Sequence, residues 1–198
     1  MGILDILLTG VGLSMDAAAV SMTNGMNEPK MKLPKILLIA LFYGVAQGLM
    51  PLIGYYAGSL FAEFVAKIAP WIALVLLGFI GGKMIFEAIC AFEKKKNGEE
   101  AEEAKPLSIG SLTVQTIATS IDALAVGVSL VALKVSGALA VNIFVAASMI
   151  AATTFVISLI SVFIGKKFGE LLSDKAELIG GLILVAIGLK IFIEGVFF

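Results

Sequence analysis

The sequence contains no histidine and no arginine, and it has a single cysteine, Cys90. One cysteine can form neither an internal disulfide nor a Cys-x-x-Cys redox pair. Without histidine the chain lacks the commonest protein ligand for zinc, copper and nickel. Any metal ion bound here would therefore be held by oxygen atoms, with methionine sulfur as the remaining alternative.

Charged residues are scarce as well. They make up 15% of the 198 residues, whereas 60% are hydrophobic, and the mean hydropathy is +1.06. Soluble domains have about 25% charged residues, and a chain this short cannot hide such an apolar excess in a soluble core. A lipid bilayer is therefore the expected environment. The net charge of −1 gives no indication of a nucleic-acid partner.

The long apolar runs predict an all-α integral membrane protein with six transmembrane helices, because about 20 apolar residues span a bilayer. We expect the spans at 3–24, 36–60, 68–91, 107–132, 138–164 and 178–197. The first span is expected to end at Asn24-Gly25, a pair typical of helix C-termini. The one long polar stretch, 93–106, is interpreted as a flexible cytoplasmic linker.

Lysine distribution predicts the orientation in the membrane. The loops on one side of the expected bundle hold only Lys67 and Lys134. By the positive-inside rule the opposite, lysine-rich side is cytoplasmic, which places both termini outside. The lysines of that side follow the first, third and fifth spans: Lys30, Lys32, Lys35, Lys94, Lys95, Lys96, Lys105, Lys166, Lys167 and Lys175.

An internal repeat links the two halves of the chain. Residues 14–21, Ser-Met-Asp-Ala-Ala-Ala-Val-Ser, match residues 120–127, Ser-Ile-Asp-Ala-Leu-Ala-Val-Gly. An Ile-Gly-x-Lys motif followed by glutamate recurs at 80–87 and 187–194. We therefore predict two three-helix repeats, 1–92 and 107–198, separated by the linker 93–106. Because three spans reverse the chain's direction, the repeats are inverted, as in many secondary transporters.

Asp16 and Asp122 are the strongest candidates for chemistry. They occupy equivalent repeat positions inside apolar spans, where an ionised residue costs about 2.5–3.5 kcal/mol on insertion scales. Both carboxylates are therefore expected to face the protein interior and to approach each other near the membrane midplane. Two carboxylates among hydroxyls and amides suit Mg²⁺, Ca²⁺ or Mn²⁺. Protons could neutralise the same pair, which suggests proton–metal exchange. Hydrogen bonding that only locks the helices together is the structural alternative.

Further oxygen ligands are expected beside the aspartates. Thr119 lies on the same helical face as Asp122. Pro51 frees the carbonyl of Gln47 by kinking the second span, although the kink could equally serve packing alone. Asn24 is a weaker ligand candidate because it could simply cap its helix.

Two lysine–glutamate pairs recur in the third and sixth spans. Lys83 and Glu87, like Lys190 and Glu194, are four residues apart and could neutralise each other. We interpret them as ion pairs at opposite membrane faces or, alternatively, as gates at each end of a transport path.

The chain resembles the MntP-type manganese efflux pumps, which are related to the LysE exporter superfamily. The resemblance rests on four motifs: residues 14–21 quoted above, 47–55 (Gln-Gly-Leu-Met-Pro-Leu-Ile-Gly-Tyr), 81–87 (Gly-Gly-Lys-Met-Ile-Phe-Glu) and 118–128 (Ala-Thr-Ser-Ile-Asp-Ala-Leu-Ala-Val-Gly-Val). It covers essentially the whole chain. It implies export of Mn²⁺ across the bacterial inner membrane, with Asp16 and Asp122 as essential acids.

Other functions remain as alternatives. One alternative is an exporter of another small solute, such as an amino acid, built from the same six-helix arrangement. Another is a membrane scaffold that transports nothing. The Tyr-Asp and Gly-x-Gly-Asp signatures of aspartyl intramembrane proteases are absent, and so is a Gly-x4-Gly-Lys-Ser/Thr nucleotide-binding motif. We therefore expect no enzyme and no cofactor. The expected partners are Mn²⁺, protons and the bilayer, and a homo-oligomer is left open.

Overall fold

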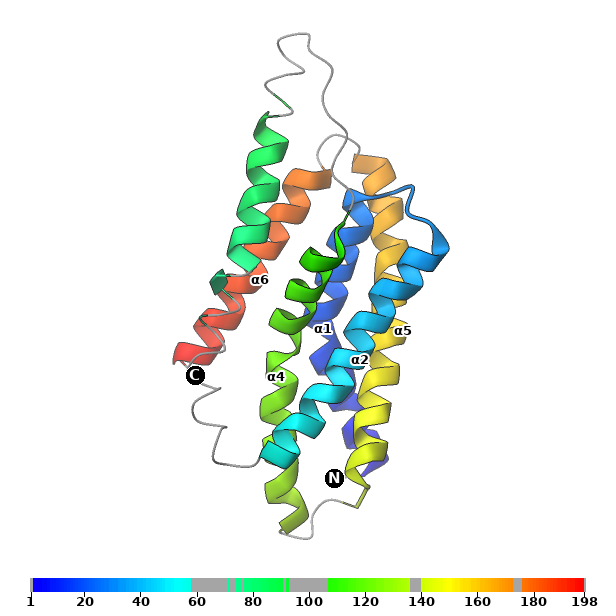
Figure 1. Cartoon of the computed structure of the whole chain (residues 1–198), viewed down its shortest axis with the longest axis vertical. Coiled ribbons are helices and arrows are strands. Elements are labelled where there is room, and N and C mark those ends of the chain that lie inside the picture. The colour runs from blue at the N-terminus through cyan, green and yellow to red at the C-terminus, as the bar shows by residue number, and fades with distance from the viewer. Residues whose placement is uncertain are drawn as a thin grey trace.

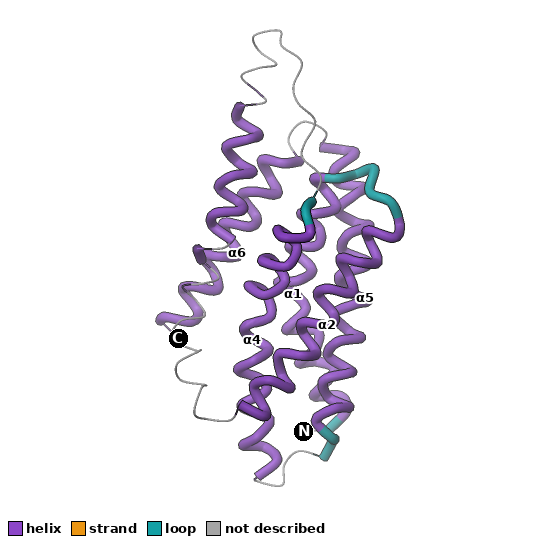
Figure 2. The backbone as a smooth tube through the Cα atoms, in the orientation of Figure 1, coloured by secondary structure: helices purple, strands orange, loops and turns teal. Residues whose placement is uncertain are grey.

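The structure is a computed structural model that describes residues 2–57, 71, 74–75, 77–90, 92, 107–135, 140–172 and 176–197. Its helices are α1 (Ile3–Asn27), α2 (Leu33–Ala57), α4 (Ile109–Val135), α5 (Ile143–Leu172) and α6 (Ala176–Phe197). Residues 77–90 form a further helical segment. Helices and loops account for all the described residues, without a strand (Figure 2). The expected linker 93–106 and much of the third span lie outside this part of the chain.

Four of the described helices are long and apolar enough to cross a membrane: α1, α2, α4 and the Ile143–Gly169 part of α5. In α6 the apolar stretch is shorter and runs from Leu178 to Lys190. Large apolar side chains such as Leu8, Phe79 and Val156 point outward. Lipid is the solvent that accommodates such a surface, and helices satisfy their backbone groups internally. The chain is therefore an all-α, multi-pass membrane protein.

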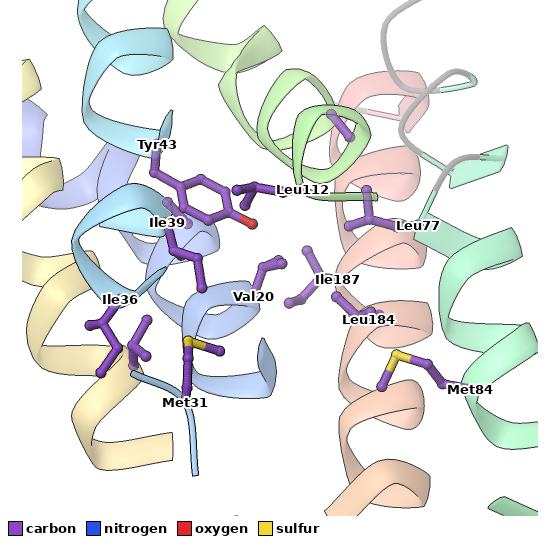
Figure 3. Packing of buried hydrophobic residues seen from close by; sticks show 13 residues of the cluster. Val20, Met31, Ile36, Ile39, Tyr43, Leu77, Met84, Leu112, Leu184 and Ile187 are labelled. Carbon is purple, nitrogen blue, oxygen red and sulfur yellow. The ribbon is translucent and has the colours of Figure 1, made fainter. Parts of the chain in front are cut away.

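The helices form two neighbouring groups (Figure 1). One group contains α1, α2, α4 and α5, and we call it the four-helix group. The other contains α6 and the segment 77–90, and we call it the helix pair. A buried apolar cluster joins them, with Val20 and Leu112 on one side and Leu77, Leu184 and Ile187 on the other (Figure 3). This cluster holds the helix pair against the face of α1 that carries Asp16.

Glycines set the spacing within the four-helix group. A Cβ atom added at Gly25 of α1 would overlap the carbonyl oxygen of Val162 in α5, and one at Gly165 would overlap that of Met22. Gly54 of α2 and Gly127 of α4 are packed against each other's helix in the same way. Small residues allow this backbone approach in membranes. The glycines therefore pack α1 closely against α5, and α2 closely against α4.

The expected end of the first span at Asn24-Gly25 is wrong, because α1 continues to Asn27. Gly25 lies inside the helix, where its missing side chain admits α5 rather than ending the helix. Pro51 lies inside α2 as predicted, and it is buried against Gly127.

The polar ends of several helices meet at one end of the molecule. In the loop after α1, a carboxylate oxygen of Glu28 accepts hydrogen bonds from the Lys35 ammonium (2.5 Å) and from the backbone N–H of Leu107 (3.3 Å). The Lys166 ammonium of α5 donates to the Met31 carbonyl at 2.8 Å. The lysine-rich loop after α1 therefore lies beside the lysine-rich end of α5 and the start of α4.

Candidate metal site

Asp16 and Asp122 lie at matching heights of their helices. Each is the fourteenth residue of its helix, counted from Ile3 in α1 and from Ile109 in α4. These helices have 25 and 27 residues, so both carboxylates lie near the middle of a membrane-crossing segment. The charges of the two carboxylates are near enough to act on each other.

The two carboxylates differ in their surroundings. The Asp16 side chain is 17% exposed, and its Oδ1 accepts a hydrogen bond at 3.3 Å from the Lys190 ammonium of α6. Asp122 is an exposed residue whose Oδ1 accepts a 2.8 Å bond from the N–H of Ala123. The expected inward placement therefore fits Asp16 better than Asp122, which is an exposed residue. The Lys190 charge acts on Asp122 as well as on Asp16.

Gln47 connects the two aspartate-bearing helices. Its side chain is fully buried, and its Nε2 donates to the carbonyl oxygen of Leu13 at 3.1 Å and to that of Thr119 at 3.0 Å. Leu13 and Thr119 each precede an aspartate by three residues, so they are equivalent in the predicted repeat. A single amide of α2 thus bonds equivalent positions of the two predicted repeats. This bridge fixes α1 against α4 one turn from the carboxylates.

The Oε1 atom of Gln47 is buried and accepts no hydrogen bond from the described residues. Thr154 and Ser158 of α5, at the repeat positions of Gln47 and Pro51, also carry buried hydroxyls without a partner in the described part of the chain. Such groups are costly in a dry interior. Buried oxygens without donors are suited to accept a cation or a water molecule.

Thr119 is buried, and its hydroxyl donates within α4 to the carbonyl oxygens of Gln115 (3.0 Å) and Thr116 (3.3 Å). It is the backbone carbonyl of Thr119, rather than its hydroxyl, that contacts Gln47. The hydroxyl oxygen keeps acceptor capacity after donating its proton.

Asn24 belongs to a second polar cluster, two turns along α1 from Asp16. Its Nδ2 donates to Gln115 Oε1 at 2.9 Å, and the Tyr43 hydroxyl donates to the same oxygen at 3.3 Å. All three side chains are buried. Tyr43 was not among the predicted site residues, although a tyrosine inside an apolar span signals a buried hydroxyl that needs a partner.

The structure adds a partner to one of the predicted lysine–glutamate pairs, because Lys190 reaches Asp16 on another helix. The side chain of Glu194 lies outside the described part of the chain, Lys83 is exposed and Glu87 is half-buried. The gating role of these four residues stays a prediction. No group of three or more Asp, Glu, Cys or His side chains gathers among the described residues. A metal site in this part of the chain would therefore contain at most two such side chains.

Gln47→Leu is expected to lower the free energy of unfolding by about 1–3 kcal/mol, because it removes two interhelical hydrogen bonds from a buried site. Thr154→Val, which removes a buried hydroxyl without a partner among the described residues, should be neutral or stabilising. Thermal unfolding of both variants in detergent measures the difference. Equal melting temperatures for Gln47→Leu and the wild type would contradict the bridging role.

Comparison with known proteins shows the family. The model of a family described as "Mntp: Putative manganese efflux pump" matches residues 30–192. Relatives named "Putative manganese efflux pump MntP" occur in Clostridium botulinum (47% identical; 98% of this chain and 96% of the relative), Ruminiclostridium cellulolyticum (44%; 100% and 99%) and Rippkaea orientalis (45%; 98% and 98%). No solved structure matches the chain. The chain therefore belongs to the MntP family of putative manganese efflux pumps.

Proposed function

We propose that this protein is a secondary transporter that exports Mn²⁺ from the bacterial cytoplasm across the inner membrane, through a site built on Asp16 and Asp122. The observation that carries the proposal is the placement of these carboxylates. They lie at matching mid-helix positions of α1 and α4, near enough for their charges to interact. Mid-membrane carboxylates are costly unless a cation or water compensates them. The names of the relatives supply the cargo and the direction.

Neutral oxygens complete the proposed site. The Oε1 of Gln47 accepts no hydrogen bond from the described residues, and it belongs to the α2 side chain that bonds α1 and α4 one turn from the carboxylates. The hydroxyl of Thr119 lies on α4, one turn before Asp122. Mn²⁺ accepts such oxygen ligands in octahedral arrangements. Asn24, beside Gln115 and Tyr43, would meet the ion further toward the α1 C-terminus rather than at the carboxylates.

We further propose that the chain consists of two inverted three-helix repeats that alternate access to this site. The hydrogen bonds of Gln47 to equivalent carbonyls of α1 and α4 support this arrangement. The clustering of Lys35 and Lys166 at one end of the molecule supports a cytoplasmic assignment of that end. The exposure of the residue Asp122 at the surface of the chain supports access to one side of the site.

Flux through purified protein tests the proposal. Proteoliposomes containing a Mn²⁺-quenched dye should lose fluorescence when Mn²⁺ is added outside, and protein-free vesicles should not. A pH-sensitive dye in parallel vesicles should report proton movement opposite to Mn²⁺ if the two cations exchange. Mn²⁺ flux without any pH change would remove proton exchange from the proposal, and the absence of flux above empty vesicles would refute transport itself.

A further inference from the structure

Lys190 is a lysine at the end of an apolar stretch whose side chain contacts a carboxylate on another helix. It lies fifteenth of the 22 residues of α6, at the end of the apolar stretch Leu178–Lys190. A lysine in such a position usually extends its side chain to the membrane surface. Here the ammonium instead donates to Asp16 Oδ1 of α1 at 3.3 Å. Lys190 therefore occupies one of the oxygens that the proposed site would offer to a metal ion.

The Lys190 ammonium lies in the place where a metal ion would meet Asp16. When both aspartates are ionised they carry two negative charges, and the Lys190 ammonium that contacts Asp16 brings one positive charge. A divalent cation would neutralise the two carboxylates without help. If the ammonium stayed in place, three positive charges would face two negative charges in a region of low dielectric constant. The metal ion and the ammonium are therefore competitors for Asp16.

We propose that Lys190 is a tethered counter-cation, which neutralises Asp16 while the site is empty and is displaced when a divalent metal ion binds. This inference rests on the proposed function and adds a residue that sets the affinity and the rate of release. The Lys190 side chain is 53% exposed, so the ammonium can leave Asp16 without breaking a packed core. A transport site must bind its ion weakly enough to release it. An internal competitor that returns to Asp16 provides that release.

A purely structural role makes a different prediction. If the Lys190–Asp16 contact only fastened α6 to α1, its loss would destabilise the protein and weaken or leave unchanged the binding of metal. A displaced competitor has the opposite effect on affinity, because its removal leaves Asp16 without a counter-charge. The sign of the change in Mn²⁺ affinity therefore separates the two roles.

The test measures Mn²⁺ binding and Mn²⁺ efflux on the full-length protein. Free Mn²⁺ is followed by electron paramagnetic resonance during titration of detergent-purified protein. Lys190→Met should lower the Mn²⁺ Kd by about tenfold or more, since one nearby charge is worth a tenfold change or more in binding. The same variant in proteoliposomes should show a lower maximal Mn²⁺ flux, because release is slower. Lys190→Arg keeps the charge and should restore both values.

Matched variants locate the effect. Lys134→Met removes a lysine charge at the end of α4, where its ammonium lies 5.3 Å from the centre of the Tyr55 ring, and should leave the Kd unchanged. Asp16→Asn should lose Mn²⁺ binding. An unchanged or higher Kd in Lys190→Met, with binding still lost in Asp16→Asn, would overturn the counter-cation and leave the proposed function intact. Wild-type binding in Asp16→Asn would overturn both.

Discussion

Asparagine at position 16 or 122 is expected to reduce manganese export at least about 100-fold, because the loss of one carboxylate removes more than about 2.7 kcal/mol of attraction to a divalent cation. The change keeps the size and shape of the side chain. The hydrogen bonds of Gln47 to the backbone of Leu13 and Thr119 do not involve the carboxylates, so the helices should stay in place. Export should therefore be lost from a protein that is still folded.

The measurement is cellular manganese content in bacteria that lack their own exporter. Cells expressing the wild-type chain should accumulate less manganese and survive higher external concentrations than cells expressing Asp16→Asn or Asp122→Asn. Asp5→Asn is the matched control, since Asp5 is an exposed aspartate in the first turn of the same helix α1. Membrane levels of all variants are compared by immunoblot. Full protection by both mid-helix variants, at equal levels, would disprove the proposed site.

Gly165→Ala is expected to destabilise the protein by about 3 kcal/mol or more, at the upper end of the cost of overpacking. The added Cβ would overlap the carbonyl oxygen of Met22 and would lie 2.9 Å from the Met22 Cα. Both obstacles are backbone atoms, so no side-chain rotation relieves the clash. The facing contact at Gly25, against Val162 and Lys166 of α5, is just as tight. The two helices would have to separate along their length.

Thermal unfolding monitored by size-exclusion chromatography after heating measures this effect. Gly78→Ala is the matched control, because a Cβ at Gly78 would meet no atom within 4 Å and alanine favours helix formation. The control should therefore melt at or slightly above the wild-type temperature. A Gly165→Ala protein that melted with the control would show that α1 and α5 are further apart than described.

The sequence predicted the helical membrane fold well, because lipid imposes a simple rule of length and apolarity. It also identified Asp16 and Asp122 as candidate site residues, since charge is rare inside apolar spans and the two positions are equivalent in the predicted repeat; their role as ion ligands stays a prediction. The inverted arrangement of the repeats and the ligand roles of Gln47, Asn24 and Thr119 stay predictions.

The predicted end of the first helix was wrong because a local sequence signal coincided with a contact between helices. Asn24-Gly25 is a common C-terminal pair, but in α1 the glycine admits α5 and the asparagine bonds Gln115 on α4. The contact of Lys190 with Asp16, which joins residues 174 positions apart, was not predicted either, and the pairing of Lys190 with Glu194 stays a prediction. Tyr43 gave no charge or repeat signal at all. Contacts between distant helices depend on how glycines set their separation, which helical periodicity does not encode.

Glycine positions differ within and between the two groups of helices in the kind of atom that packs against them. Within the four-helix group, Cβ atoms added at Gly25, Gly54 and Gly127 would overlap the backbone of the neighbouring helix, and within the helix pair Cβ atoms added at Gly81 and Gly181 would each overlap the other's carbonyl oxygen. At the boundary, the atoms nearest to a Cβ added at Gly180 of α6 are side-chain atoms, two of them from α1. Side chains can change rotamer where backbones cannot, so shear between the two groups costs least along this boundary. The Lys190–Asp16 contact also joins the two groups across this boundary. If a bound metal ion displaces Lys190 from Asp16, one contact between the groups is lost, and the helix pair can slide more easily along the four-helix group.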